Sequence, residues 1–414
     1  MSDHSVTVAP SGAPTSPQPE LKLGALPKAL LRSAAYFTPP RFIHRRRMHR
    51  SAGIPRPGAS ALAAVSVLAD EVVLAGFKIT RNPPTDEAWE RIAGEVDEAL
   101  ELFEQRGWLD DPRSFHATPN PPSDIDARDV RRWERLGLQW EQLRWTSTWQ
   151  PDPDDPGAER WMSYDRNHRG SAWLLRHEGD QPRPWVVVLH GTEQGRLLVD
   201  QRVFRAKHLH EDLGCNVVMP LLPLHASRRP RIAATTGFPT LDVLDNVHGL
   251  AQSAYDVRCL LGWVRDQQPS GVALVGLSLG GGVAALVAGL EEPLGGVAGL
   301  VPAVDFPDVF HRQTPHMMRN EAAFVRLDAS SRTLHQVVSP MSFEPATPPE
   351  RLHILAGLSD RLLDPCAQAG RLAAHWGTDN VRWVHQGHVT HMGSGALVET
   401  IDDAVAGCGA DQRA

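Results

Sequence analysis

A glycine-flanked serine between two apolar runs constrains the fold of this chain more than any other feature. Gly276-Leu277-Ser278-Leu279-Gly280 follows the apolar residues 272–275 and precedes the small and apolar residues 281–288. The order predicts a buried strand, a sharp turn and a buried helix. Such a turn lifts the serine hydroxyl clear of a strained backbone, and the flanking glycines let strand and helix pass closely. The pattern therefore predicts an accessible serine beside a helix N-terminus, which favours negative charge.

Two other interpretations fit these glycines. Gly276, Gly280 and Gly282 also fit the phosphate-binding loop of a short-chain dehydrogenase. That interpretation requires a Tyr-x-x-x-Lys pair downstream, but the last lysine is Lys207 and the last tyrosine is Tyr255. The pair therefore cannot follow the loop. A purely structural glycine-rich turn remains as the second alternative.

Two later strand ends carry the partners that a serine nucleophile needs. Residues 352–356 are typical of a strand and lead through Gly-x-x-Asp to Asp360, and residues 381–384 are typical of the next strand and lead through Gly-His to His388. Serine, acid and histidine in this chain order match a known triad arrangement. In this layout the chain resembles the α/β-hydrolase superfamily. The resemblance implies Ser278 as nucleophile, Asp360 as acid and His388 as base.

Each partner has competitors in the sequence. Asp364 follows the same strand as the favoured acid, but aspartate before proline is typical of a helix cap. Asp305 follows another strand-like run, and some members of the superfamily place their acid there. His385 falls within a strand, where we expect it to pack, and His391 lies one helical turn beyond the favoured histidine. His388 is favoured because it follows a glycine at the end of a strand and because it comes after the serine and the acid in the chain, as the triad order requires.

The resemblance also implies an oxyanion hole, a pair of backbone N–H groups that stabilise charge on a substrate oxygen. Residues 185–189 form a continuous apolar run, as expected of a central strand buried on both faces, and end in His190-Gly191-Thr192. In the superfamily, the loop after this strand supplies one N–H group and the residue after the nucleophile supplies the other. These map to Thr192 and Leu279. We expect His190 to be structural.

A proline-rich stretch after the strand predicted at 216–219 resembles one particular subgroup of the superfamily. The spacing of Pro223, Arg228 and Pro230 resembles a poorly characterised subgroup of α/β-hydrolase domain-containing proteins, although His225 stands where an aromatic residue is expected. Arg228 has two interpretations. It either contacts solvent or a loop carbonyl, or it lies at the pocket mouth and meets a carboxylate or phosphate.

The charge of the chain is divided unevenly. Residues 1–58 contain nine Lys or Arg and two acidic residues, which gives +7, whereas the whole chain carries −7, so the remainder carries −14. A basic amphipathic segment can bind anionic membrane, but it can also pack against the acidic body of its own protein. The acidic remainder argues against a nucleic-acid partner.

Cysteine spacing and apolar runs bear on compartment and cofactors. The four cysteines form no C-x-x-C pair, so we expect reduced thiols and neither a metal site nor a cofactor. The start of the chain lacks a secretory signal pattern, and no run of about 18 apolar residues occurs. We therefore expect a cytoplasmic protein, with membrane association as an option. Only four of the 42 basic residues are lysines, a bias typical of GC-rich bacterial genomes.

The sequence predicts three parts. Residues 1–58 form a disordered or basic segment, residues 59–140 a helical extension, and residues 141–414 an α/β-hydrolase core with a lid-like insert at about 305–349. In the core, alternating strands and helices predict a mostly parallel sheet with helices on both faces.

The expected activity is that of a serine hydrolase. Its small-molecule substrate would be a carboxylic ester, with a lipid-like ester suggested by the basic N-terminus and the apolar insert. The same triad also serves amidases, thioesterases and acyltransferases, so the triad does not select among them. A different class, an inactive protein that keeps the fold for binding, also remains open.

Overall fold

The computed structural model of the 414-residue chain describes residues 25–80, 85–179, 181–230, 237–314, 319 and 322–409. Residues 1–24, which belong to the segment expected to be disordered or basic, lie outside the described residues. Within the described ranges, no helix is both long enough and apolar enough to cross a bilayer.

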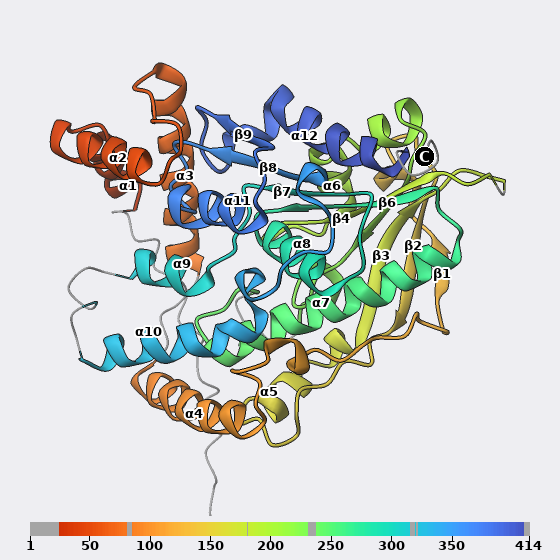
Figure 1. The fold of residues 1–414 in the computed structure, drawn as a ribbon, viewed down its shortest axis with the longest axis horizontal. Helices are drawn as coiled ribbons and strands as arrows, with labels where there is room; N and C mark the ends of the chain where they lie inside the picture. The colour runs from red at the N-terminus through yellow and green to blue at the C-terminus, as the bar shows by residue number, and fades with distance from the viewer. Residues whose placement is uncertain are drawn as a thin grey trace, which may run out of the picture.

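A mixed nine-stranded sheet organises the described residues (Figure 1). Its spatial order is β1-β2-β3-β5-β4-β6-β7-β8-β9. The first three pairings in that order are antiparallel, and the remaining five are parallel. The strands are β1 (Asp126–Asp129), β2 (Trp140–Thr146), β3 (Arg169–Leu175), β4 (Pro184–Leu189), β5 (Asn216–Pro220), β6 (Gly271–Leu277), β7 (Gly296–Leu300), β8 (Leu352–Gly357) and β9 (Val381–Val384). The expected sheet of the α/β-hydrolase fold is therefore present.

Helices cover both faces of this sheet, as expected (Figure 1). Helices α7 (Val243–Asp266) and α8 (Leu279–Leu290) pack on one face, and α6 (Leu197–Val203) and α12 (Gly395–Ala406) pack on the other. The central strands are buried on both sides because their alternate residues enter two different cores. On β4, Val187 belongs to the core with α7 and α8, whereas Val186 and Val188 belong to the core with α12. A continuous apolar run is the sequence pattern that such burial requires.

The sheet begins earlier in the chain than expected. Strand β1 lies within residues 59–140, which were expected to be helical, and pairs with β2 at the edge of the sheet. All four of its residues, Asp-Ala-Arg-Asp, are exposed. A polar edge strand has no apolar alternation that a sequence pattern could reveal, and its charges protect the edge from pairing with other chains.

In the described residues, four α-helices precede the sheet. They are α1 (Ala25–Tyr36), α2 (Pro39–Ser51), α3 (Ala61–Thr80) and α4 (Asp86–Gln105). Helix α1 packs on α3, and α4 packs on α7 and on α10 (Ala322–Leu334). Thr85 caps α4 by accepting the N–H of Ala88, as its sequence predicts. In Figure 1, α3 stands at the end of the sheet formed by β8 and β9, with α1 and α2 beyond it.

The segment between β7 and β8 holds α9 (Phe306–Gln313) and α10. It corresponds in position to the insert expected at about 305–349. The described residues also include the short α-helices α5 (Ala158–Met162) and α11 (Arg371–Trp376). Helix α10 contacts both α9 and α4, so the insert packs against one of the N-terminal helices.

Candidate active site

Ser278 lies on a strained turn between β6 and α8. Its backbone angles are φ 54° and ψ −112°, in a region that non-glycine residues rarely adopt. The turn is fixed because the Ser278 N–H donates to the carbonyl of Leu300 at 2.8 Å and the Gly282 N–H donates to the Ser278 carbonyl at 3.1 Å. A Cβ on Gly276 would collide with the Gly280 carbonyl, and one on Gly280 would collide with the Leu189 carbonyl. The two glycines therefore allow the close packing that the sequence pattern predicted.

The structure brings Ser278, His388 and Asp360 together. The Nε2 atom of His388 lies 3.0 Å from the Ser278 hydroxyl oxygen, and its Nδ1 atom lies 2.7 Å from Oδ2 of Asp360. The other Asp360 oxygen accepts the N–H groups of Leu362 and Leu363, both at 2.8 Å. These two bonds fix the carboxylate at the end of β8. The imidazole is therefore held between a fixed carboxylate and a half-buried hydroxyl.

The surroundings of His388 favour its charged form. Burial acts to lower its pKa, but the negative charges of Asp360 and Asp70 outweigh burial and raise the pKa above its usual value. His391, whose ring centroid lies 6.3 Å from that of His388, behaves differently. Burial lowers the pKa of His391 to about 4. His391 is therefore neutral near pH 7, and His388 is the histidine of the two with a raised pKa.

Asp70 on α3 is a buried residue of this site that the sequence did not assign. Its Oδ2 atom accepts the N–H groups of Arg361 at 2.9 Å and His388 at 2.8 Å, and its Oδ1 atom accepts the N–H of Val389 at 3.0 Å. One side chain thus holds the loop after β8 and the loop after β9. Burial and the nearby carboxylate of Asp360 raise the pKa of Asp70 to about 6.

Two further contacts connect α3 to the same loops. The carboxylate of Glu71 binds the Arg361 guanidinium, with distances of 3.0 Å to Nε and 2.9 Å to Nη2. The Ser66 hydroxyl lies 2.7 Å from the Thr390 hydroxyl. The sequence signal that could have identified these two residues is an adjacent acidic pair within an otherwise apolar helix. Carboxylates that are buried with such a helix need specific partners.

The competing residues have other partners. Asp364 caps the turn that follows it, accepting the N–H groups of Cys366 and Ala367 at 3.0 and 3.1 Å. Asp305 caps α9 and binds Arg371. His385 faces Gly58, where an added Cβ would lie 3.5 Å from its Nδ1 atom. None of these described contacts involves the Ser278 hydroxyl.

The loop after β4 passes directly against the Ser278 turn. A Cβ on Gly191 would lie 3.5 Å from Cβ of Ser278. Thr192 is the next residue along this loop. Leu279 is the first residue of α8, where backbone N–H groups lack acceptors within the helix. His190 is structural: its Nε2 accepts the N–H of Leu222 at 3.1 Å, and burial lowers its pKa to about 3.

Arg228 does not lie at a pocket mouth. It is 1% exposed and donates to the carbonyls of Leu221 and Asn167 and to the Asp256 carboxylate, at 2.9, 2.8 and 2.7 Å. The interpretation that it meets a substrate carboxylate or phosphate at the pocket mouth is wrong, because the side chain is buried and paired with the Asp256 carboxylate. Arg228 instead connects the proline-rich loop to α7.

A serine on a strand-to-helix turn, beside a buried histidine and a carboxylate from later strand ends of a mostly parallel sheet, defines a protein of the α/β-hydrolase fold. A solved acetyl xylan esterase from Paenibacillus sp. R4 has the same fold, with a TM-score of 0.50 and 16% sequence identity over 72% of this chain and 98% of the esterase. The sequence matches no family model.

Two Mycobacterium tuberculosis proteins are much more similar in sequence. Uncharacterized protein MT2702 of strain CDC 1551 / Oshkosh and Uncharacterized protein Rv2627c of strain H37Rv are each 40% identical to this chain over 336 residues. The match covers 81% of this chain and 79% of each relative. The chain belongs to the family of these two proteins.

Proposed function

We propose that this protein is a serine hydrolase that cleaves a carboxylic ester. The observation that carries the proposal is the pair of contacts made by His388, 3.0 Å to the Ser278 hydroxyl and 2.7 Å to the Asp360 carboxylate. A nucleophile within hydrogen-bond reach of a base, which a third group orients, is the geometry required for covalent catalysis.

In the proposed reaction, Ser278 Oγ attacks the ester carbonyl while His388 Nε2 takes its proton. Asp360 holds the Nδ1–H of His388 and stabilises the imidazolium that forms. The backbone N–H groups of Leu279 and Thr192 stabilise the negative oxygen of the tetrahedral intermediate. The alcohol leaves with the proton from His388, and water then attacks the acyl-enzyme with His388 again as base. The raised pKa of His388 favours the proton transfer from serine.

The finer part of the proposal is a lipid-like ester and a contact with anionic membrane through α1 and α2. Leu30, Leu31 and Ile43 are 57%, 71% and 50% exposed on these helices. Arg47 and Arg50 are exposed on α2, and neither has an ion pair within the part of the chain that the structure describes. Exposed apolar and basic side chains on the same two helices support contact with an anionic membrane, whereas Arg32 of α1, 4.0 Å from Glu71, lies against the protein itself.

Labelling with a fluorophosphonate tests the proposed nucleophile. We expect the wild-type protein to be labelled at Ser278, as located by peptide mass spectrometry, and to hydrolyse p-nitrophenyl esters. Ser278→Ala should lose labelling and at least about 1,000-fold of the turnover, because the nucleophile is removed. The matched control Ser163→Ala removes an exposed hydroxyl elsewhere and should behave as wild type.

Two results would contradict the proposal. Ser278→Ala with wild-type turnover would place the nucleophile elsewhere. A folded wild-type protein that neither takes the label nor hydrolyses any ester of an acyl-chain series would favour the binding-protein alternative. A matching series of amides and thioesters distinguishes the ester proposal from the other activities of such a triad.

A further inference from the structure

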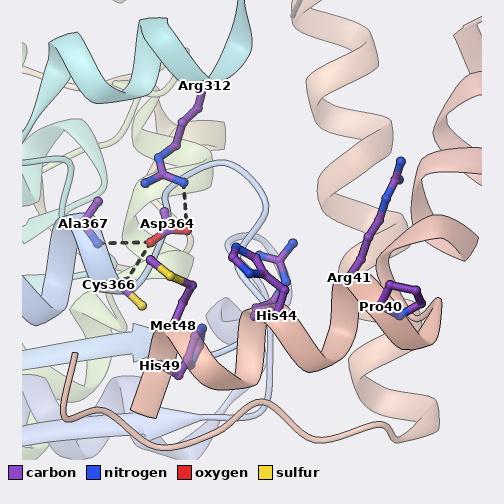
Figure 2. A pocket seen from close by; sticks show the side chains of 10 residues that line it. Pro40, Arg41, His44, Met48, His49, Arg312, Asp364, Cys366 and Ala367 are labelled. Carbon is purple, nitrogen blue, oxygen red and sulfur yellow. Dashed lines mark hydrogen bonds and ion pairs between the residues drawn. The ribbon is translucent and has the colours of Figure 1, made fainter. Parts of the chain in front are cut away.

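A cavity of about 600 Å³ lies between α2, α9 and the loop that follows β8. Figure 2 shows Arg41 and His44 of α2 on one side of it and Arg312 and Asp364 on the other. A second cavity of about 580 Å³ shares Arg41, Arg312 and Asp364 with the first and extends along the loop to Asp360. The two cavities therefore adjoin each other, and the second one reaches the acid of the candidate active site.

The carboxylate within the first cavity already has its partners. Oδ1 of Asp364 accepts two backbone N–H groups, and Oδ2 binds Nη1 of Arg312 at 3.1 Å (Figure 2). Arg312 also binds Asp308 at 2.7 Å. This carboxylate is therefore bonded to α9 and to its own turn, and within the described residues it forms no hydrogen bond or ion pair with the arginines of α2.

The two arginines of α2 in this cavity lack such partners. Within the described residues, neither Arg41 nor Arg45 forms a hydrogen bond or an ion pair with a carboxylate. The Arg45 guanidinium lies 4.3 Å from the ring centroid of Tyr36, and its buried Nε has no hydrogen-bond partner. Burial lowers the pKa of Arg45, and the like charges of Arg361 and Arg312 lower it further, although the nearby Tyr36 and Asp364 act to raise it. A buried donor and neighbouring like charges are both costly unless an anion compensates them.

We propose that this cavity binds the anionic group, a phosphate or a carboxylate, of a small molecule. Arg41 and Arg45 are at positions i and i+4 of one helix, so their side chains lie on the same face. Guanidinium groups bind carboxylates and phosphates through paired N–H groups, and such charge-assisted bonds are strong. The volume exceeds that of a phosphate group alone, which leaves room for the rest of the molecule. The site does not require the proposed esterase activity.

Calorimetric titration with inorganic phosphate tests the site at constant ionic strength. The wild-type protein should bind phosphate, and the Arg41→Gln/Arg45→Gln variant should bind it at least tenfold more weakly. The matched control is Arg47→Gln/Arg50→Gln, which removes the same charge from exposed positions of the same helix and should change the affinity by less than twofold. If Arg45→Gln disturbs folding through its contact with Tyr36, Arg41→Gln alone should still weaken binding at least threefold. An undetectable heat with the wild-type protein, or equal weakening in both double variants, would overturn the proposal.

A phosphate group can come from a soluble molecule or from a lipid headgroup, and co-sedimentation with phosphatidic acid vesicles distinguishes these sources. If the ligand is a headgroup, the cavity variant should lose more vesicle binding than the control variant, and free phosphate should compete. If the ligand is soluble, both double variants should lose vesicle binding equally while only the cavity variant loses phosphate binding. Because no readout depends on turnover, failure here is separate from failure of the proposed hydrolase activity.

Discussion

Replacing Asp70 by asparagine should impair catalysis even though Asp70 does not contact the Ser278 hydroxyl. The Asp70 carboxylate accepts three backbone N–H groups, from Arg361, His388 and Val389. Asparagine offers a single oxygen, and its amide group would face the remaining donors. At least one N–H group therefore loses its acceptor, and the loops that carry the acid and the histidine can shift. Because a displacement of about 1 Å at a reacting group can cost about 100-fold in rate, we expect kcat/KM to fall by roughly 10- to 100-fold.

The same substitution should also move the pH dependence of the reaction. The proposed base must be neutral, so kcat/KM falls at pH values below the pKa of His388, which Asp360 and Asp70 together hold above its usual value against the effect of burial. Asparagine removes the negative charge of Asp70, which is one of the contributions that raise this pKa. Asp70 itself takes up a proton near pH 6, which reduces the effect. We expect the acidic limb to move to lower pH.

Stopped-flow or steady-state hydrolysis of a p-nitrophenyl ester from pH 5 to pH 9 measures both effects. Glu71→Gln is the matched control, because Glu71 is the next residue on α3 and binds the Arg361 side chain rather than the backbone of the histidine loop. Its acidic limb should stay at the wild-type position. Unfolding stability is a poor readout here, since asparagine removes a costly buried charge as well as hydrogen bonds. An Asp70→Asn enzyme with wild-type kcat/KM and an unmoved limb would refute the reasoning.

Three other perturbations have definite expected outcomes. Burial raises the pKa of Asp200 to about 7, so the folded state holds an extra proton between about pH 4 and pH 7 and loses stability as pH rises through that window. Asp200→Asn should therefore raise Tm more at pH 8 than at pH 5, as scanning calorimetry can measure. Arg228→Met should lower the free energy of unfolding by about 3–5 kcal/mol in urea titrations, because the buried Asp256 carboxylate loses its cationic partner and keeps only the Ser147 hydroxyl. Arg47→Glu/Arg50→Glu should weaken co-sedimentation with anionic vesicles, an effect that should shrink as salt rises, while turnover of a short soluble ester stays unchanged. Equal sedimentation of variant and wild type would leave α2 without a membrane role.

The Ser278 turn could be predicted because its determinants are local. A strand, two glycines and a helix are written within about fifteen consecutive residues, and each constrains the backbone of the next. Asp360 and His388 are distant in sequence, but each follows a strand, and the ends of neighbouring parallel strands meet at one edge of a sheet. Strands β6, β7, β8 and β9 are consecutive neighbours in the sheet. Chain order and strand order therefore coincide in this half of the fold, which is why a linear motif located these residues.

The role of Asp70 could not be predicted from any local pattern. Its partners His388 and Arg361 lie 318 and 291 residues away, and the contact exists because α3 crosses the far end of the sheet. An adjacent acidic pair in an apolar helix is an unusual pattern, but the pattern does not show which groups bind the carboxylates. Arg228 illustrates the converse limit. A charged residue in a proline-rich loop looks exposed in the sequence, and only the position of Asp256 on α7 makes burial tolerable.

Helix α3, which lies within residues 59–140, supports the candidate site directly. A hydrolase core that began at residue 141 would keep Ser278 and His388 but would lack α3. Three backbone N–H groups beside the acid and the histidine would then lose their acceptor, and the Arg361 guanidinium would lose Glu71. Buried donors without partners are costly, so the two loops would rearrange to reach water. The N-terminal helices are therefore a structural part of the candidate site: α3 supports the loops from behind, and α2 closes the arginine-lined cavity on the same acid loop.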